Sequence, residues 1–155
     1  MKRAVFVLVL AACVAGGAFS QERQGYIKPT FSGGFSVVNI EGHTETLTAL
    51  ALDVDFVSAI GLTFGLQTAM AWNNDVGGDL FAAFGLGWTF GDTLWSAGAK
   101  IMAVPFYDGG IGINANGTWW FNENVGLSGI LDLATNLGYI DWTLFSLRIG
   151  ISTRI

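Results

Sequence analysis

Residues that could carry chemistry are few in this sequence. It contains one histidine, His43, and no phosphate-binding loop, zinc-ligand spacing or nucleophile elbow. A hydrolytic site would need a serine and an acid beside that histidine. No serine stands next to His43, and its acidic neighbours Glu41 and Glu45 are common in polar turns. We therefore predict a solvated turn histidine, and we expect no catalytic residue, no metal site and no bound cofactor.

A second set of polar residues alternates with apolar ones inside otherwise apolar segments. Asp53 and Asp55, for example, are separated by Val54. Side chains on a strand alternate between two faces, so such residues share one face. The residues on this polar face that could line a lumen are Asp53, Asp55, Gln67, Lys100, Asn114, Asn116, Asp132, Arg148 and Arg154. Charges on an enclosed face must be paired or hydrated, because isolation from water is costly. The set predicts either an internal polar network or the lining of a polar path.

The elements that must position these residues are strands with one large apolar face. The pattern is clearest in residues 59–72, where Leu62 and Phe64 alternate with Thr63 and Gly65. The same period predicts strands at residues 30–40, 45–56, 59–72, 79–90, 94–104, 110–121, 125–134 and 140–155. Most are close to the roughly 9–11 residues that a tilted strand needs to cross a bilayer. Connections after the second, fourth and sixth strands are tight and the others are mostly longer, as in outer-membrane barrels.

The composition indicates where the large apolar face points. The chain is 52% hydrophobic and 12% charged, whereas about 25% of residues are charged in typical globular domains. So few charges cannot cover a water-exposed surface, and we predict that the large apolar face meets lipid. The net charge is −5. An acidic chain of this kind lacks the basic face that phosphate groups need, so we expect no nucleic-acid partner.

The first residues have the features of a secretory signal peptide. Lys2 and Arg3 precede an uncharged apolar run, and small residues stand before a predicted cut at Gln21. We predict a signal peptide at 1–20, a periplasmic N-terminal segment at 21–29 and a barrel domain at 30–155, exported by the general secretory route. The alternative is a lipobox ending at Cys13, which would then be lipidated.

Aromatic residues gather near both ends of the predicted strands. The predicted membrane-interface set is Phe56, Trp72, Trp88, Phe90, Trp95, Trp119, Phe121, Tyr139 and Trp142. Two aromatic belts are typical of the two faces of a lipid bilayer, so the expected partner is outer-membrane lipid. The alternative is the core of a soluble barrel, which would need a second protein layer over these residues.

The leader, the eight period-two segments, the connection lengths and the aromatic ends together resemble the small bacterial outer-membrane β-barrels of the OmpA-like and OmpW-like kind. The resemblance covers Thr30 to Ile155 and implies an all-β, eight-stranded antiparallel up-and-down transmembrane β-barrel. It also implies an outer-membrane location and contact with the barrel assembly machinery during biogenesis. The chain departs from these barrels at its last residue, which is Ile155 rather than an aromatic residue.

Several alternatives remain from the sequence. The segment from Phe56 to Asn74 carries no charge and is long enough for a membrane helix, although its period is two. For function, we expect a structural or surface-interaction role with a lumen filled by the polar network, because eight strands enclose little space. A narrow channel or a carrier of small, even hydrophobic, solutes is the alternative, since many inward positions are glycine. A lipid-modifying enzyme is a remote alternative.

The period of two also predicts the effect of inserted charges. Leu86 and Ile113 have the outward parity, and Asn114 has the inward one. Arginine at either outward position should impair membrane assembly, because an arginine on the lipid face near mid-membrane destabilises the folded barrel by about 2–4 kcal/mol. Arginine at Asn114 should be better tolerated, because it can be hydrated or can reach a lumen acid.

Overall fold

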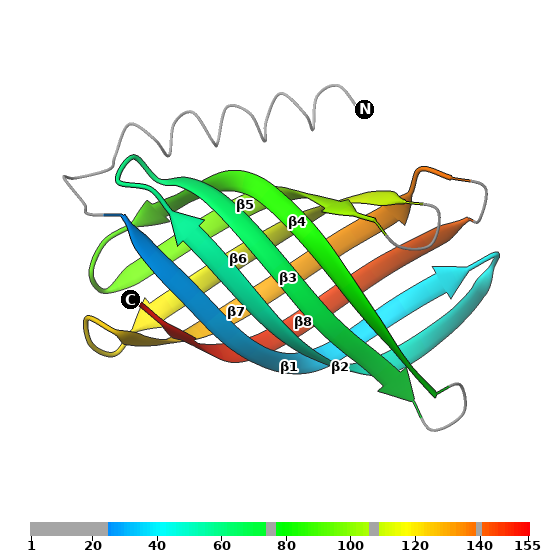
Figure 1. Ribbon diagram of the computed structural model, residues 1–155. Coiled ribbons are helices and arrows are strands. Elements are labelled where there is room, and N and C mark those ends of the chain that lie inside the picture. Colours follow the sequence, from blue (N-terminus) through cyan, green and yellow to red (C-terminus); the bar gives the residue numbers. More distant parts are fainter. Residues whose placement is uncertain (1–24, 74–76, 106–108, 139–140) are drawn as a thin grey trace.

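The computed structural model describes residues 25–73, 77–105, 109–138 and 141–155. Eight antiparallel strands form one closed barrel, in which each strand pairs with its sequence neighbours and the first pairs with the last (Figure 1). The strands are β1 (Tyr26–Ile40), β2 (His43–Val57), β3 (Leu62–Asn73), β4 (Gly77–Gly91), β5 (Trp95–Val104), β6 (Gly110–Trp120), β7 (Val125–Asn136) and β8 (Trp142–Thr153). The predicted fold class is therefore confirmed. The start of β1 and the end of β8 lie at one end of the barrel, named here the inner end, and the β1–β2 hairpin lies at the opposite, outer end.

The wall has the two faces that the period of two predicts. Leu86, Ile113 and Ile149 are exposed on the outside, with exposed fractions of 58%, 38% and 64%. Inward residues such as Ser36 and Ser152 are fully buried. An apolar exterior of this extent is stable only when covered, and it fits a bilayer as it does in transmembrane barrels.

The helical alternative for Phe56 to Asn74 is wrong, because β3 occupies most of that segment. Within the described ranges, no helix is long and apolar enough to cross a membrane.

The connections differ less in length than the sequence predicts. They span two to five residues at the outer end and three to four at the inner end, because the strands continue as paired hairpins. In the β1–β2 hairpin, Ile40 pairs with His43 across a two-residue turn. Glu41 and Gly42 both have positive φ, 50° and 87°. Turns of this type match the right-handed twist of the strands, so the hairpin stays paired to its tip.

The first strand starts four residues before its predicted start at Thr30. Residues 26–29, predicted to belong to a periplasmic segment, are part of the wall, and Lys28 points into the lumen, where it is buried. The backbone of Ile27 exchanges two hydrogen bonds of 3.0 Å with Ile155. These bonds extend the β1–β8 seam to the last residue of the chain. The predicted leader, its cut and Cys13 lie outside the described residues.

Candidate functional site in the barrel lumen

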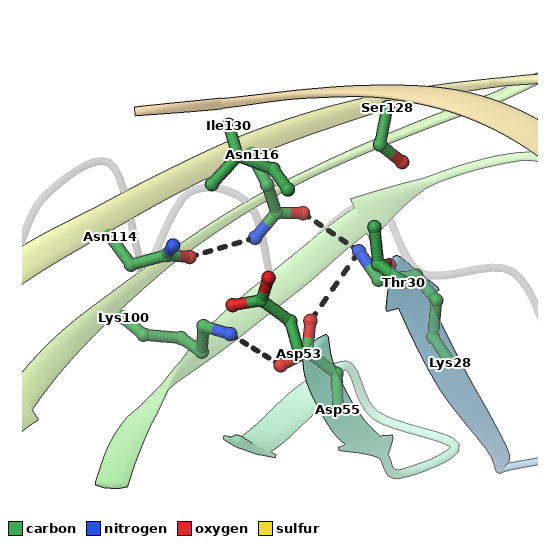
Figure 2. A pocket seen from close by; sticks show the side chains of 9 residues that line it. All are labelled: Lys28, Thr30, Asp53, Asp55, Lys100, Asn114, Asn116, Ser128 and Ile130. Atoms are coloured by element: carbon green, nitrogen blue, oxygen red, sulfur yellow. Dashed lines mark hydrogen bonds and ion pairs between the residues drawn. The ribbon is translucent and has the colours of Figure 1, made fainter. Parts of the chain in front are cut away.

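The inner half of the lumen contains a first ion cluster built from four strands, β1, β2, β5 and β6 (Figure 2). Lys28 Nζ lies 3.4 Å from Asp55 Oδ2 and donates a hydrogen bond of 2.8 Å to Asn116 Oδ1. Lys100 binds the other oxygen of the same carboxylate. Asp55 therefore receives one lysine from β1 and one from β5, which ties opposite walls together across the lumen.

A second cluster lies beside the first and is centred on one guanidinium. Arg148 donates to Asp53 Oδ2 at 2.9 Å from Nη1 and to Asp132 Oδ2 at 2.6 Å from Nη2. Asn114 Nδ2 donates to Asp132 Oδ1 at 2.6 Å, and Gln67 Nε2 donates to Asp132 Oδ2 at 3.3 Å. Charge-assisted bonds of this kind are among the stronger hydrogen bonds in proteins.

The two clusters are joined and their charges balance. Asn116 Nδ2 donates to Asn114 Oδ1 at 3.1 Å and so connects them. Three cations, Lys28, Lys100 and Arg148, face three carboxylates, and all six side chains are buried. Burying unpaired charges would be very costly, so a network of net charge zero is the arrangement that a closed lumen can hold. We name these residues the inner plug: Lys28, Asp53, Asp55, Gln67, Lys100, Asn114, Asn116, Asp132 and Arg148.

Hydroxyl groups fill the space on the inner-end side of the plug. Thr30 and Ser152 are hydrogen-bonded at 2.6 Å, as are Thr118 and Ser128, and Ser128 is bonded to Ser152. This chain links β1, β8, β7 and β6. The cavity left between these hydroxyls and the first ion cluster is about 10 Å³, which is room for about one water molecule. The described side chains therefore leave little space between these hydroxyls and the ion cluster.

Inward glycines make room for the plug instead of opening the lumen. A Cβ atom at Gly65 would lie 2.6 Å from Asp55 Oδ1 and 2.7 Å from Lys100 Nζ. Such distances are below van der Waals contact, so a side chain at this position would force the ends of Asp55 and Lys100 to shift. At Gly65, the space that the missing side chain leaves is occupied by the Asp55–Lys100 ion pair.

Eight of the nine residues predicted to line the lumen belong to the inner plug. Arg154 does not: its guanidinium stacks on Trp120 at 3.9 Å and on Tyr26 at 4.8 Å at the inner end, a cation–π arrangement. The sequence analysis missed Lys28, although it shares the parity of Thr30. Extending the alternation of β1 backwards by one pair of residues would have found it.

The predicted interface aromatics divide into three groups. Those exposed on the outer wall near the inner turns are Phe56, Trp95, Trp119 and Phe121. Three more, Trp72, Trp88 and Phe90, are half-buried. Tyr139 lies outside the described residues. The prediction for Trp142 is wrong, because it points into the lumen with 8% of its surface exposed. A Cβ at Gly110 would lie 2.6 Å from its ring, so Gly110 provides the space.

The outer half of the lumen is a cavity of about 390 Å³. Its lining is mainly apolar, and we name it the outer chamber, lined by Val38, Ile40, Leu47, Ala71, Phe81, Ala83, Met102, Val104, Ala134, Trp142 and Leu144. Gln67 and Asp132 of the inner plug form its floor, and His43 and Glu45 also line it. His43 is exposed, as predicted for a solvated histidine.

Comparison with known proteins gives structural neighbours only. No protein-family model matches the sequence, and no curated protein does. The neisserial surface protein NspA superposes with a TM-score of 0.66 at 10% identity, covering 84% of this chain and 97% of that one. Ail of Yersinia pestis, in complex with the heparin analogue sucrose octasulfate, superposes with a TM-score of 0.57 at 12% identity, and the match covers 86% of this chain and 100% of that one. The outer membrane protein OprG of Pseudomonas aeruginosa superposes with a TM-score of 0.55 at 11% identity, and the match covers 88% of this chain and 98% of that one.

The chain has the fold of the small eight-stranded outer-membrane β-barrels. This agrees with the predicted resemblance, and at 10–12% identity it establishes the fold alone. What an outer-membrane barrel does depends on its lumen and loops rather than on its wall.

Proposed function

We propose that the protein is a bacterial outer-membrane barrel that spans the membrane as a closed, non-conducting unit with its termini in the periplasm. The apolar exterior, the neighbours of the same fold and the predicted signal peptide support this location. The principal role is structural, with surface interactions limited to the short outer hairpins.

The observation that carries the proposal is the charge-balanced inner plug. Every charged side chain in it has an opposite partner, and hydrogen bonds and ion pairs connect the plug residues of seven strands, all except β4. Ions moving through would have to break buried pairs, each of which is costly to open. A permanently open polar channel would need a hydrated path, and the cavity within the plug is only about 10 Å³.

The outer hairpins favour a modest surface role. Their described tips carry the acids Glu41, Glu45 and Asp141 and no lysine or arginine. Ail was crystallised with a heparin analogue, a polyanion, and an acidic tip would repel such a ligand. We propose no enzymatic role, because His43 is the only histidine and no serine stands beside it.

Conductance in planar bilayers tests the proposal. The wild-type barrel should insert and stay silent. The double variant Asp132→Ala/Arg148→Ala removes one charge of each sign, so the remaining plug keeps a net charge of zero and the lumen widens, although Asp53 loses its partner Arg148. This variant should show small openings, which makes it the positive control for insertion. Discrete openings from wild-type protein would disprove the closed lumen.

A further inference from the structure

The seam between β1 and β8 is held differently from the rest of the wall (Figure 1). Consecutive strands are joined by connections of two to five residues, but β1 and β8 are the first and last strands and no turn joins them. Thr30 and Ser152, which are opposite each other at the seam, are 122 residues apart in the sequence. Closing so long a loop costs more conformational entropy than closing a hairpin. The seam is therefore the place in the wall where additional bonds matter most.

The backbone ladder at the seam has an ordinary length. It runs from the Thr30–Ser152 pair to the Ile40–Trp142 pair, which gives β1 as many paired positions with β8 as β7 has with β8. The β1–β2 and β3–β4 hairpins have longer ladders as well as a turn. Backbone pairing therefore does not compensate for the missing turn.

Inward hydroxyl groups form a second set of bonds across the seam. Thr30 and Ser152 are hydrogen-bonded at 2.6 Å. Nearer the outer end, Ser36 Oγ donates to Ser146 Oγ at 3.1 Å. Each pair joins residues that are directly opposite in the β1–β8 register, and all four side chains are buried. Burial strengthens these bonds relative to exposed ones, because the local dielectric is low.

Arg148 of β8 adds a charged group between the two hydroxyl pairs. Its Nη1 donates to Ser32 Oγ of β1 at 2.8 Å and to Asp53 Oδ2 of β2 at 2.9 Å, and its Nη2 binds Asp132 of β7. If β8 moved away from β1, Arg148 would keep Asp132 on its own hairpin and lose Ser32 and Asp53. Removing the cation from a buried pair is strongly unfavourable. We name the residues that bridge β1 and β8 the seam ladder: Thr30, Ser32, Ser36, Ser146, Arg148 and Ser152.

We infer that the seam ladder is a latch that keeps the wall closed and couples closure of the wall to assembly of the inner plug. The hydroxyl pairs hold β1 against β8, and because of Arg148 the seam cannot open without also breaking the second ion cluster. The inference goes beyond the non-conducting barrel proposed above, because it concerns sideways opening of the wall and not passage along the axis. Each of the two can fail without the other.

A hydroxyl pair elsewhere in the wall provides an internal comparison. Thr63 Oγ1 of β3 donates to Thr89 Oγ1 of β4 at 2.8 Å, and both side chains are buried. This bond has the chemistry of the seam pairs, but β3 and β4 are also joined as a hairpin. Its loss should therefore open β3 and β4 much less than the loss of a seam pair opens β1 and β8.

Amide hydrogen exchange in lipid nanodiscs, followed by NMR, tests the latch. Ser36→Ala/Ser146→Ala removes both hydroxyls of one seam pair, and neither serine belongs to the inner plug. Backbone amides of β1 and β8 should exchange roughly tenfold faster or more, because the seam opens more often, while those of β3 and β4 keep their rates. Thr89→Val is the matched control, in which Thr63 still donates to Gly61 O, and it should leave exchange in β1 and β8 unchanged.

A covalent link across the seam separates loss of the latch from general loosening of the barrel. Asn39 and Thr143 are opposite each other across the seam near its outer end. Oxidised Asn39→Cys/Thr143→Cys joins β1 to β8 and should abolish the acceleration caused by Ser36→Ala/Ser146→Ala. Reduction of the disulfide should restore that acceleration.

Folding of each variant is checked first by heat-modifiable gel mobility, and Ser146→Ala alone replaces the double variant if that one does not fold. Unchanged exchange in β1 and β8 of a folded seam variant would overturn the inference. So would acceleration that persists with the disulfide closed, or acceleration of the same size in β1 and β8 of Thr89→Val. None of these results affects the conductance test, which examines the axial path through the inner plug.

Discussion

The two halves of the lumen are built by the same strands but have opposite interiors. In the inner half, inward positions carry charged, amide and hydroxyl side chains that reach one another, and a cavity of about 10 Å³ remains. In the outer half, inward positions carry mainly apolar side chains, from Ala71 to Trp142, and a cavity of about 390 Å³ remains. The closed wall thus allows the inward side chains to differ in polarity and size from one end of the barrel to the other. Paired polar groups stabilise the inner half, and an apolar cavity remains in the outer half.

This contrast predicts unequal tolerance to substitution, with the largest effect at the centre of the plug. Arg148→Met leaves Asp53 and Asp132 buried without their cation. Removing one partner of a buried pair typically costs about 3–5 kcal/mol. The free energy of unfolding from urea titration in lipid vesicles should fall by that amount. Met102→Leu, a similar-sized change in the chamber, should cost less than about 1.5 kcal/mol. Equal losses for the two would remove the distinction between the halves.

The comparison also requires that lipid surrounds both halves. Leu86→Arg places a charge on the exposed outer wall and should reduce folded yield, at about 2–4 kcal/mol if it lies near mid-membrane. The sequence suggests Asn114 as the inward control, but that side chain is 1% exposed within the plug. Ala134 is the better control, because an arginine in the chamber can reach water at the mouth. Heat-modifiable gel mobility measures the folded fraction of Leu86→Arg and of Ala134→Arg. Normal folding of Leu86→Arg would argue against a lipid-facing wall.

A smaller effect is expected where glycine makes room for the plug. Gly65→Ala places a Cβ against Asp55 and Lys100, and overpacking of this kind costs about 1–3 kcal/mol. Gly129→Ala is the matched control, because a Cβ there meets nothing within 4 Å. The difference between their unfolding free energies measures how tightly the plug is packed. If both variants match the wild type, the lysine has more freedom than the geometry indicates.

The smallest effect should come from trimming the chamber. Leu144 is half-buried and already borders the cavity. Leu144→Ala should therefore cost about 1 kcal/mol, less than the roughly 1.5–3 kcal/mol for a fully buried leucine and less than the roughly 2.7–5 kcal/mol seen for Leu→Ala in packed cores. Urea titration measures the difference. A loss as large as that of Arg148→Met would mean that the outer half is packed like a core.

Much of the wall follows from sequence alone, because a period of two is a local property of each strand. The alternation around Leu62 and Phe64 predicts which face meets lipid, and the same parity places Asp53, Asp132 and Arg148 inside. Trp142 has the parity of Arg148 and is buried inside, so the alternation of β8 applied back to its first residue would have placed it correctly; its nearness to a predicted loop suggested the interface instead.

Only the tertiary structure decides which inward residues meet. The pairing of Lys28 with Asp55 depends on where β1 begins and on the register of β1 against β2, in which the two are opposite. Arg148 reaches Asp53 across the lumen, and no spacing along the chain encodes that distance. The outer chamber is a void between side chains of different strands. The chamber exists because the side chains that face one another at this height are together too small to fill the lumen. Which side chains face one another is decided when the barrel closes, and it cannot be read from a single strand.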